Sequence, residues 1–109
     1  MKVAIAAEGE QVSAHFGHCK AYVLADVADG RVDGVQVLAA PEHEPGALPA
    51  FLNSHGVKAV VAGGMGARAV GLFAGYGIEA ITGVTGTVED ALAHLAAGDL
   101  QSGPSLCDH

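Results

Sequence analysis

The second half of the chain repeats one order of segments twice: a short apolar run, a glycine turn and a helical segment. Residues 57–62 (VKAVVA) precede the turn GGMG, after which Ala69, Leu72 and Phe73 recur at helical spacing. Residues 78–82 precede a second turn, GVTG, and another helical segment. Because crossover helices of this kind join parallel strands of one sheet, the order predicts an α/β fold with two parallel strands.

The first half supplies three more strands. Residues 2–7 (KVAIAA) form a short apolar run that predicts a buried, central strand. Residues 21–27 and 31–38 flank Asp29-Gly30, a pair that suits the positive φ angles of a tight turn, and they predict an antiparallel hairpin. The five runs together predict a five-stranded mixed β-sheet.

Apolar residues at helical spacing predict three α-helices that flank this sheet, one before Gly56 and one after each glycine turn. The last helix has the clearest ends, since Thr87 and Asp90 fit a capping box and Gly98 fits the position after a helix. We therefore expect one domain over residues 1–98 and a loosely ordered tail over residues 99–109.

The expected strand order brings three loops together. If the strand at residues 2–7 lies beside the strand at residues 57–62, the chain leaves these two strands toward opposite edges of the sheet. Open α/β sheets bind ligands at such a switch point, outside the carboxyl ends of the strands. The loops at residues 8–20, 63–66 and 83–86 would then share one rim, and we expect the functional site there.

The first of these loops contains two imidazoles and one thiol within residues 13–19 (SAHFGHC). Imidazole and thiolate suit zinc, copper and iron, and Gly17 lets the backbone turn so that His15 and His18 can face one ion. The alternative is structural: one histidine caps a strand, the other is solvated, and Cys19 is a small buried residue. The loop alone leaves both interpretations open.

The second loop, residues 63–66 (GGMG), is suited to an anion. Small residues between a strand and a helix leave backbone N–H groups able to point at a ligand near the positive end of the helix dipole. Arg68 follows on the first helical turn, while Met65 offers either a thioether ligand or a side chain that fills the core. Close packing of the helix on the strand is the alternative explanation for the glycines.

Composition narrows the classes of function. The formal charge of −7, from twelve acidic and five basic residues, argues against a protein that grips nucleic acid through its phosphates. Cys19 and Cys107 lie far apart in the sequence and suit a reducing compartment. The apolar run before Glu8 is too short for a signal peptide or a membrane span, so we expect a cytoplasmic protein without a membrane partner.

The sequence favours binding over catalysis. It shows no Ser/His/Asp order, no P-loop lysine after the glycines and no close pair of carboxylates at a predicted strand end. Cys107 and His109 add a thiol and an imidazole at the end of the chain as further candidate ligands. We therefore expect a protein that is not an enzyme.

Residues 13–19 (SAHFGHC), 63–69 (GGMGARA) and 77–83 (GIEAITG), in this order, resemble the NifX/NifB-type dinitrogenase iron-molybdenum cofactor biosynthesis family, including its orange-protein-like members. The resemblance extends over nearly the whole chain, to about Gly98. It implies a ribonuclease H-like fold and a carrier or assembly protein. The cargo would be a molybdenum-containing metal-sulfur cluster, of iron-molybdenum or molybdenum-copper type, or its precursor. Other cofactor-assembly or acceptor proteins would be the partners.

Carried over to this sequence, the resemblance makes His15, His18 and Cys19 the candidate metal ligands. The other candidate cofactor-binding residues are Ser13, Phe16, Gly17, Gly63, Gly64, Met65, Gly66 and Arg68. Because thiometallate clusters are anionic, an acidic protein needs local N–H groups and a nearby cation to hold one. The second hypothesis is a nucleotide-binding or regulatory module that uses the Gly64-x-Gly66 turn, and the third is a nuclease, which rests on fold analogy alone.

Overall fold

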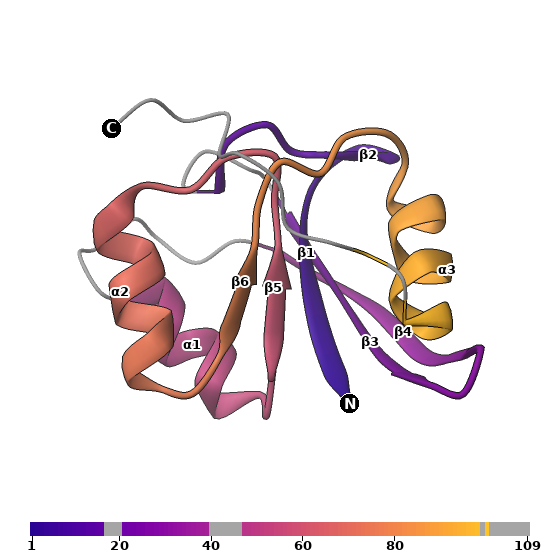
Figure 1. Ribbon diagram of the computed structural model, residues 1–109, viewed down its shortest axis with the longest axis horizontal. Helices are drawn as coiled ribbons and strands as arrows, with labels where there is room; N and C mark the ends of the chain where they lie inside the picture. Colours follow the sequence, from indigo (N-terminus) through magenta and orange to yellow (C-terminus); the bar gives the residue numbers. More distant parts are fainter. Residues whose placement is uncertain (17–20, 40–46, 99, 101–109) are drawn as a thin grey trace.

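The computed structural model describes residues 1–16, 21–39, 47–98 and 100. These residues form a six-stranded sheet and three helices (Figure 1). In chain order the elements are β1 (Lys2–Glu8), β2 (Gln11–Val12), β3 (Ala21–Ala28), β4 (Arg31–Ala39), α1 (Ala47–Ser54), β5 (Ala59–Val61), α2 (Ala67–Gly75), β6 (Glu79–Ile81) and α3 (Val88–Ala97). The α/β class, the mixed sheet and the three helices agree with the sequence.

β1 lies at the centre of the sheet. The strand order is β4-β3-β1-β5-β6, in which β1, β5 and β6 are parallel while β3 and β4 are antiparallel to their neighbours. Ile5 of β1 pairs with Val23 of β3 on one side and with Val61 of β5 on the other. The predicted neighbourhood of the first strand and the strand from residues 57–62 is thereby confirmed.

The predicted count of five strands is wrong, because the described residues form six. Gln11–Val12 makes the additional strand, β2, which pairs antiparallel with the end of β1 so that Ala7 faces Val12. Sequence reasoning assigned residues 8–20 to a loop because two residues are too few to show the alternation of a strand. The ribonuclease H-like assignment and the division into a domain and a tail stay predictions.

The β3–β4 hairpin turns at Asp29 and Gly30, whose φ angles of 50° and 78° lie in the left-handed region that a two-residue hairpin turn requires. Further along the hairpin, Leu24 pairs with Gln36 while Asp26 pairs with Asp33. β4 therefore carries one extra residue opposite Ala25, a β-bulge. β4 forms one end of the sheet.

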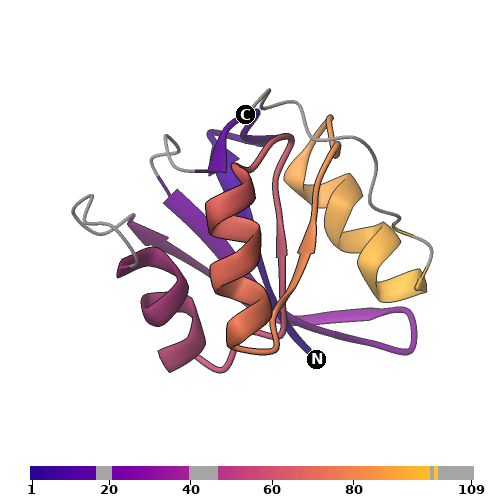
Figure 2. The same cartoon turned by 60° about the vertical axis from the view of Figure 1, so that its left-hand side comes forward.

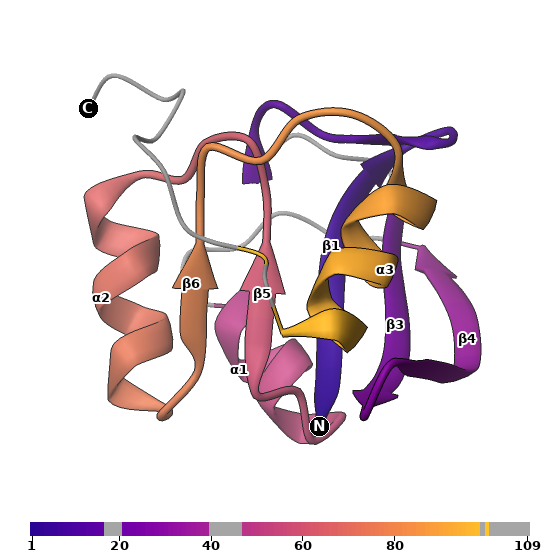
Figure 3. The same cartoon turned by 45° about the vertical axis from the view of Figure 1, so that its right-hand side comes forward.

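The helices cover the two faces of the sheet unequally. α1 and α2 lie on one face, where Leu52 and Phe73 are completely buried (Figure 2). α3 covers the other face, where Ala91 and Leu92 are buried (Figure 3). β1 is enclosed between these layers, which explains why its sequence is a continuous apolar run rather than an alternating one.

The ends of α3 agree with the sequence. The Thr87 hydroxyl accepts a hydrogen bond of 3.1 Å from the backbone N–H of Asp90, and Gly98 ends the helix in the left-handed conformation with a φ of 79°. Both are standard ways of satisfying the terminal backbone groups of a helix. In the part of the chain that the structure describes, no helix is long and apolar enough to cross a membrane.

Candidate functional site

The loops that follow β1, β5 and β6 lie at one edge of the sheet (Figure 1). Backbone hydrogen bonds join them directly: the N–H of Gly63 donates to the carbonyl of Ser13 and the N–H of Gly83 donates to the carbonyl of Gly63, both at 2.8 Å. The N–H of Val12 donates to the carbonyl of Gly86 at 2.9 Å. The rim of three loops that the strand order predicted is confirmed, and its loops are held as one unit.

Hydrogen bonds of the Ser13 hydroxyl stabilise the turn that contains His15. The side chain of Ser13 is buried, and its hydroxyl donates to the carbonyl of His15 at 3.0 Å and accepts the N–H of His15 at 3.3 Å. A serine hydroxyl that bonds to the backbone two residues on stabilises a local turn. His15 itself is exposed at the rim, so a ligand can reach it from solvent.

Phe16 fixes this loop to the glycine turn and to the core of the protein. Its N–H donates to the carbonyl of Gly64 at 2.9 Å, and its buried ring lies 5.5 Å from the ring of Tyr22 and 5.2 Å from the ring of Phe73, centroid to centroid. The hydroxyl of Tyr22 donates to the carbonyl of Phe16 at 3.0 Å. The side chain of Phe16 therefore packs in the core, while its backbone joins the first loop to the glycine turn and to β3.

The structure places only part of the predicted ligand set. His18 and Cys19, together with Gly17, lie outside the described residues, as do Cys107 and His109. Among the residues whose positions are described, no three His, Cys, Asp or Glu side chains gather where they could hold a metal ion. The role of these side chains as ligands stays a prediction.

Met65 lies under the rim, in the core cluster that contains Phe16 and Phe73, and it is 3% exposed. Methionine commonly fills irregular gaps in a core because its side chain is flexible and unbranched. The burial of Met65 favours this packing role over a thioether ligand. The neighbouring Gly64 contributes to the site through its backbone carbonyl, which holds the first loop.

Gly66 stands at the N-terminus of α2 and lacks a structural reason to be glycine. Its φ of −65° and ψ of 152° are extended values that any residue can adopt. Among the residues that the structure describes, none lies within 4 Å of a Cβ atom placed at this position. Neither backbone strain nor close helix–strand packing therefore explains Gly66. The open space lies beside the first N–H groups of the helix, where an anion would approach.

The N-termini of α2 and α3 differ in their electrostatics. No side chain among the described residues caps α2 at Gly66, and its first turn carries Arg68 and no acidic residue. α3, by contrast, is capped by Thr87 and carries Glu89 and Asp90 in its first turn. The N-terminus of a helix has about half a positive charge, which acidic residues of its own first turn offset. Of these two helix ends at the rim, that of α2 suits an anion.

Sequence reasoning missed Tyr22 as part of the support of this site. Tyr22 is completely buried on β3, and its hydroxyl holds the first loop through Phe16. A tyrosine within a largely apolar strand is a usable signal, because a buried phenolic hydroxyl usually finds a hydrogen-bond partner. The partner could not be read from the sequence, since it depends on where the loop returns to the sheet.

These features define a small α/β protein that has a mixed sheet and an exposed helix N-terminus at a rim of three joined loops. The family model described as dinitrogenase iron-molybdenum cofactor matches residues 1–98. The chain belongs to that family.

Known proteins resemble the chain over almost its full length. The crystal structure of PH0822 superposes with a TM-score of 0.88 at 37% sequence identity and covers 97% of both chains. The apo form of the orange protein from Desulfovibrio gigas has a TM-score of 0.74 at 20% identity, over 95% of this chain and 93% of that one. The protein MJ0580 of Methanocaldococcus jannaschii is 23% identical over 106 residues, which are 93% of this chain and 90% of the relative. At 20% identity the likeness to the orange protein shows a shared fold.

Proposed function

We propose that this protein binds an anionic metal-sulfur cluster, of iron-molybdenum or molybdenum-copper type, and carries it for cofactor assembly, storage or delivery. The observation that carries the proposal is the N-terminus of α2, where Gly66 leaves open space and no acidic residue occupies the first turn. Membership of the dinitrogenase iron-molybdenum cofactor family supports a cluster, or its precursor, as the anion.

The residues of the rim have complementary roles in this proposal. The N–H groups at the start of α2 and the guanidinium of Arg68 balance negative charge on the cluster, which the net charge of −7 would otherwise repel. His15, together with His18 and Cys19 of the same loop, supplies nitrogen and sulfur donors that suit copper and iron. Ser13 and the backbone of Gly64 hold that loop in place.

The exposure of His15 and Arg68 at the rim agrees with a carrier, and the proposed location of this carrier is the cytoplasm. His15 and Arg68 are both exposed, so a bound cluster would lie at the surface. A cargo at the surface can pass to a second protein without unfolding of the carrier. The proposed partners are therefore other cofactor-assembly or acceptor proteins, and the proposed role is binding and release, without turnover, nucleic acid or membrane.

A loading experiment tests the proposal. Protein purified without oxygen is treated with a chelator, incubated with tetrathiomolybdate alone, with copper(I) or with iron(II), and then desalted. We expect the visible chromophore to elute with the protein in at least one mixture, with a constant molybdenum content per chain by metal analysis. Loss of molybdenum from all three mixtures on desalting would refute cluster binding.

Substitution of His15 tests the site. The His15→Ala variant should retain less molybdenum than the wild type, whereas His94→Ala, an equal change at an exposed position on α3, should load normally. Equal loading of both variants would remove His15 from the site.

The competing function is a nucleotide-binding module, because a helix N-terminus also suits a phosphate group. Adding ATP or ADP to the same protein and measuring ultraviolet absorbance after desalting separates the two functions. Retained nucleotide together with lost thiomolybdate would favour the nucleotide-binding module.

A further inference from the structure

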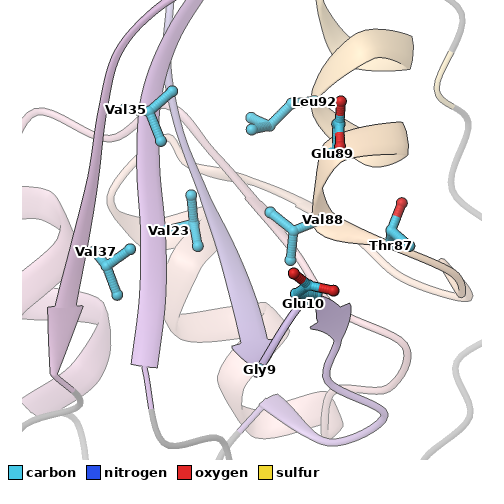
Figure 4. A pocket seen from close by; sticks show the side chains of 9 residues that line it. All are labelled: Gly9, Glu10, Val23, Val35, Val37, Thr87, Val88, Glu89 and Leu92. Atoms are coloured by element: carbon cyan, nitrogen blue, oxygen red, sulfur yellow. The ribbon is translucent and has the colours of Figure 1, made fainter.

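A groove lies between β4 and α3, on the side of the sheet that carries α3 (Figure 4). It has a volume of about 330 Å³, and its apolar lining residues are Val23, Val35, Val37, Val88 and Leu92. Val23 is buried, whereas its partner on β4, Val37, is 66% exposed and Val35 is 55% exposed. The apolar surface therefore continues from the core into solvent, as is typical of an interaction surface.

Acidic residues lie where the β1–β2 turn and the start of α3 form one end of this groove. Glu10, from the turn, and Glu89, from the first turn of α3, are both exposed and both line the groove. The backbone N–H of Val88 donates to the carbonyl of Glu10 at 2.9 Å, so the two segments are joined. The described residues that line the groove include no lysine, arginine or histidine. The groove thus combines an apolar surface with two carboxylates.

These charges select a basic occupant. Because the chain has a net charge of −7, a second copy, a nucleic acid or an anionic cluster would be repelled from the two carboxylates. A lysine or arginine would be attracted to them, and its aliphatic stem can contact the neighbouring valines. Complementary charge of this kind excludes partners of the wrong sign and speeds association with the right one.

The open side of the groove favours a segment of a protein over a small molecule. Sites for small molecules enclose most of the ligand surface, whereas Val35 and Val37 leave one side of this groove exposed. An extended segment can lie along such a surface. Alternate residues of an extended segment face the same side, so apolar and basic residues at every second position would all face the groove.

We propose that the groove between β4 and α3 binds an extended segment of a partner protein, whose apolar side chains contact Val37 and Leu92 and whose lysine or arginine side chains pair with Glu10 and Glu89. Because one short segment buries less than the roughly 1,200 Å² of a standard interface, the complex is transient. The inference does not depend on the cargo of the rim, since the apolar part of the groove lies on the opposite face of the sheet from α2.

Titration with probe peptides, followed by the amide NMR signals of the protein, tests the chemistry of the occupant. The probe has two leucines followed by two lysines, each separated from the next by one serine, and is used together with its reversed sequence. We expect one direction to bind with a Kd below about 1 mM and to shift signals of groove residues. Replacing lysine by glutamate, or leucine by serine, should weaken binding about five-fold or more.

The same titration can overturn the proposal without any variant of the protein. Absence of binding in both directions would do so, as would equal binding of the glutamate or the all-serine control. Signal shifts confined to residues outside the groove would place the peptide elsewhere. Raising the ionic strength from about 0.01 to 0.15 M shortens the screening length from about 30 to 8 Å, so it should weaken binding. Affinity that does not fall with salt would remove the carboxylates from the site.

Substitutions that remove one negative charge locate the carboxylates. Glu10→Gln and Glu89→Gln should each weaken binding of the leucine–lysine peptide by about 1.5- to 5-fold, as expected for an exposed charge pair. Glu79→Gln, an equal change at an exposed position on β6, should bind like the wild type. Full affinity in both groove variants, or equal loss in Glu79→Gln, would show that the peptide does not bind at these carboxylates.

A second pair of variants locates the apolar contact. Val37→Ala should weaken binding by about two- to ten-fold, because it removes apolar surface that the peptide covers. Val70→Ala is the matched control, since Val70 is an exposed valine on α2. Circular dichroism verifies that both variants are folded. Unchanged affinity in folded Val37→Ala, or equal loss in Val70→Ala, would show that β4 does not contribute to the surface.

Discussion

The backbone N–H of Phe16 donates a hydrogen bond of 2.9 Å to the carbonyl oxygen of Gly64. This bond joins the loop that carries His15 to the glycine turn before α2. The carbonyl of Phe16 is in turn held by the hydroxyl of Tyr22. The two segments that would share a bound anion are therefore fixed to one another and to the sheet.

The contribution of Tyr22 can be measured by removing its hydroxyl. Tyr22→Phe keeps the ring but removes the hydrogen bond to Phe16, so we expect a loss of about 1 kcal/mol in the free energy of unfolding. We also expect weaker retention of molybdenum, because the first loop is held less firmly. Tyr76→Phe, at an exposed position at the end of α2, should stay within about 0.5 kcal/mol of wild type and load normally. Equal effects of the two substitutions on unfolding would contradict an anchoring role.

Met65 offers a test that separates a metal ligand from a core residue. Met65→Leu preserves apolar volume, so it should cost less than about 1.5 kcal/mol and leave metal loading unchanged if the side chain only packs. Met65→Ala should cost about 2–5 kcal/mol because the residue is buried. Chemical denaturation and molybdenum analysis provide both measurements. A stable Met65→Leu variant that fails to load would identify the thioether as a ligand.

The features that sequence reasoning predicted correctly are those that depend on neighbouring residues or on a repeated order. Thr87 and Gly98 end α3 as predicted, because a cap requires particular residue types at particular spacings. The Asp29-Gly30 turn follows from the few residues that tolerate positive φ. The rim of three loops follows from the alternation of strand, glycine turn and helix, which restricts the possible strand orders.

The features that were missed depend on contacts between distant segments. Gln11–Val12 forms a strand only because the chain folds back along the end of β1. The sequence names Phe16 as a candidate cofactor-binding residue but does not show that its ring packs against Tyr22 and Phe73, which come from other elements. The sequence predicts β4 as a strand of the hairpin but does not show that its valines are exposed, since an apolar strand run does not reveal that it lies at the edge of a sheet.

Glycines at the two ends of α2 should respond differently to substitution. Gly77, just after the helix, has a φ of 73°, so Gly77→Ala should cost about 1–2 kcal/mol through backbone strain. Gly66 has an extended conformation with open space around it, so Gly66→Ala should stay within about 1 kcal/mol of wild type. Thermal or chemical unfolding of both variants gives the comparison. Strong destabilisation by Gly66→Ala would mean that glycine is needed there for the fold.

The substitution Gly66→Asp makes opposite predictions for stability and for binding. Aspartate is a better N-cap than glycine by a few tenths of a kcal/mol, and its charge near the helix N-terminus adds about 0.3–1 kcal/mol, so the variant should unfold at equal or higher denaturant concentration. The same carboxylate would occupy the open space and repel an anion, so thiomolybdate should no longer be retained after desalting.

Gly71→Asp is the matched control, because it adds the same charge within the same helix at an exposed position with open space. It should retain molybdenum like the wild type, although it gains no cap. Normal loading of a folded Gly66→Asp variant would show that the anion does not bind at the N-terminus of α2. Equal loss in Gly71→Asp would attribute the effect to net charge instead of position.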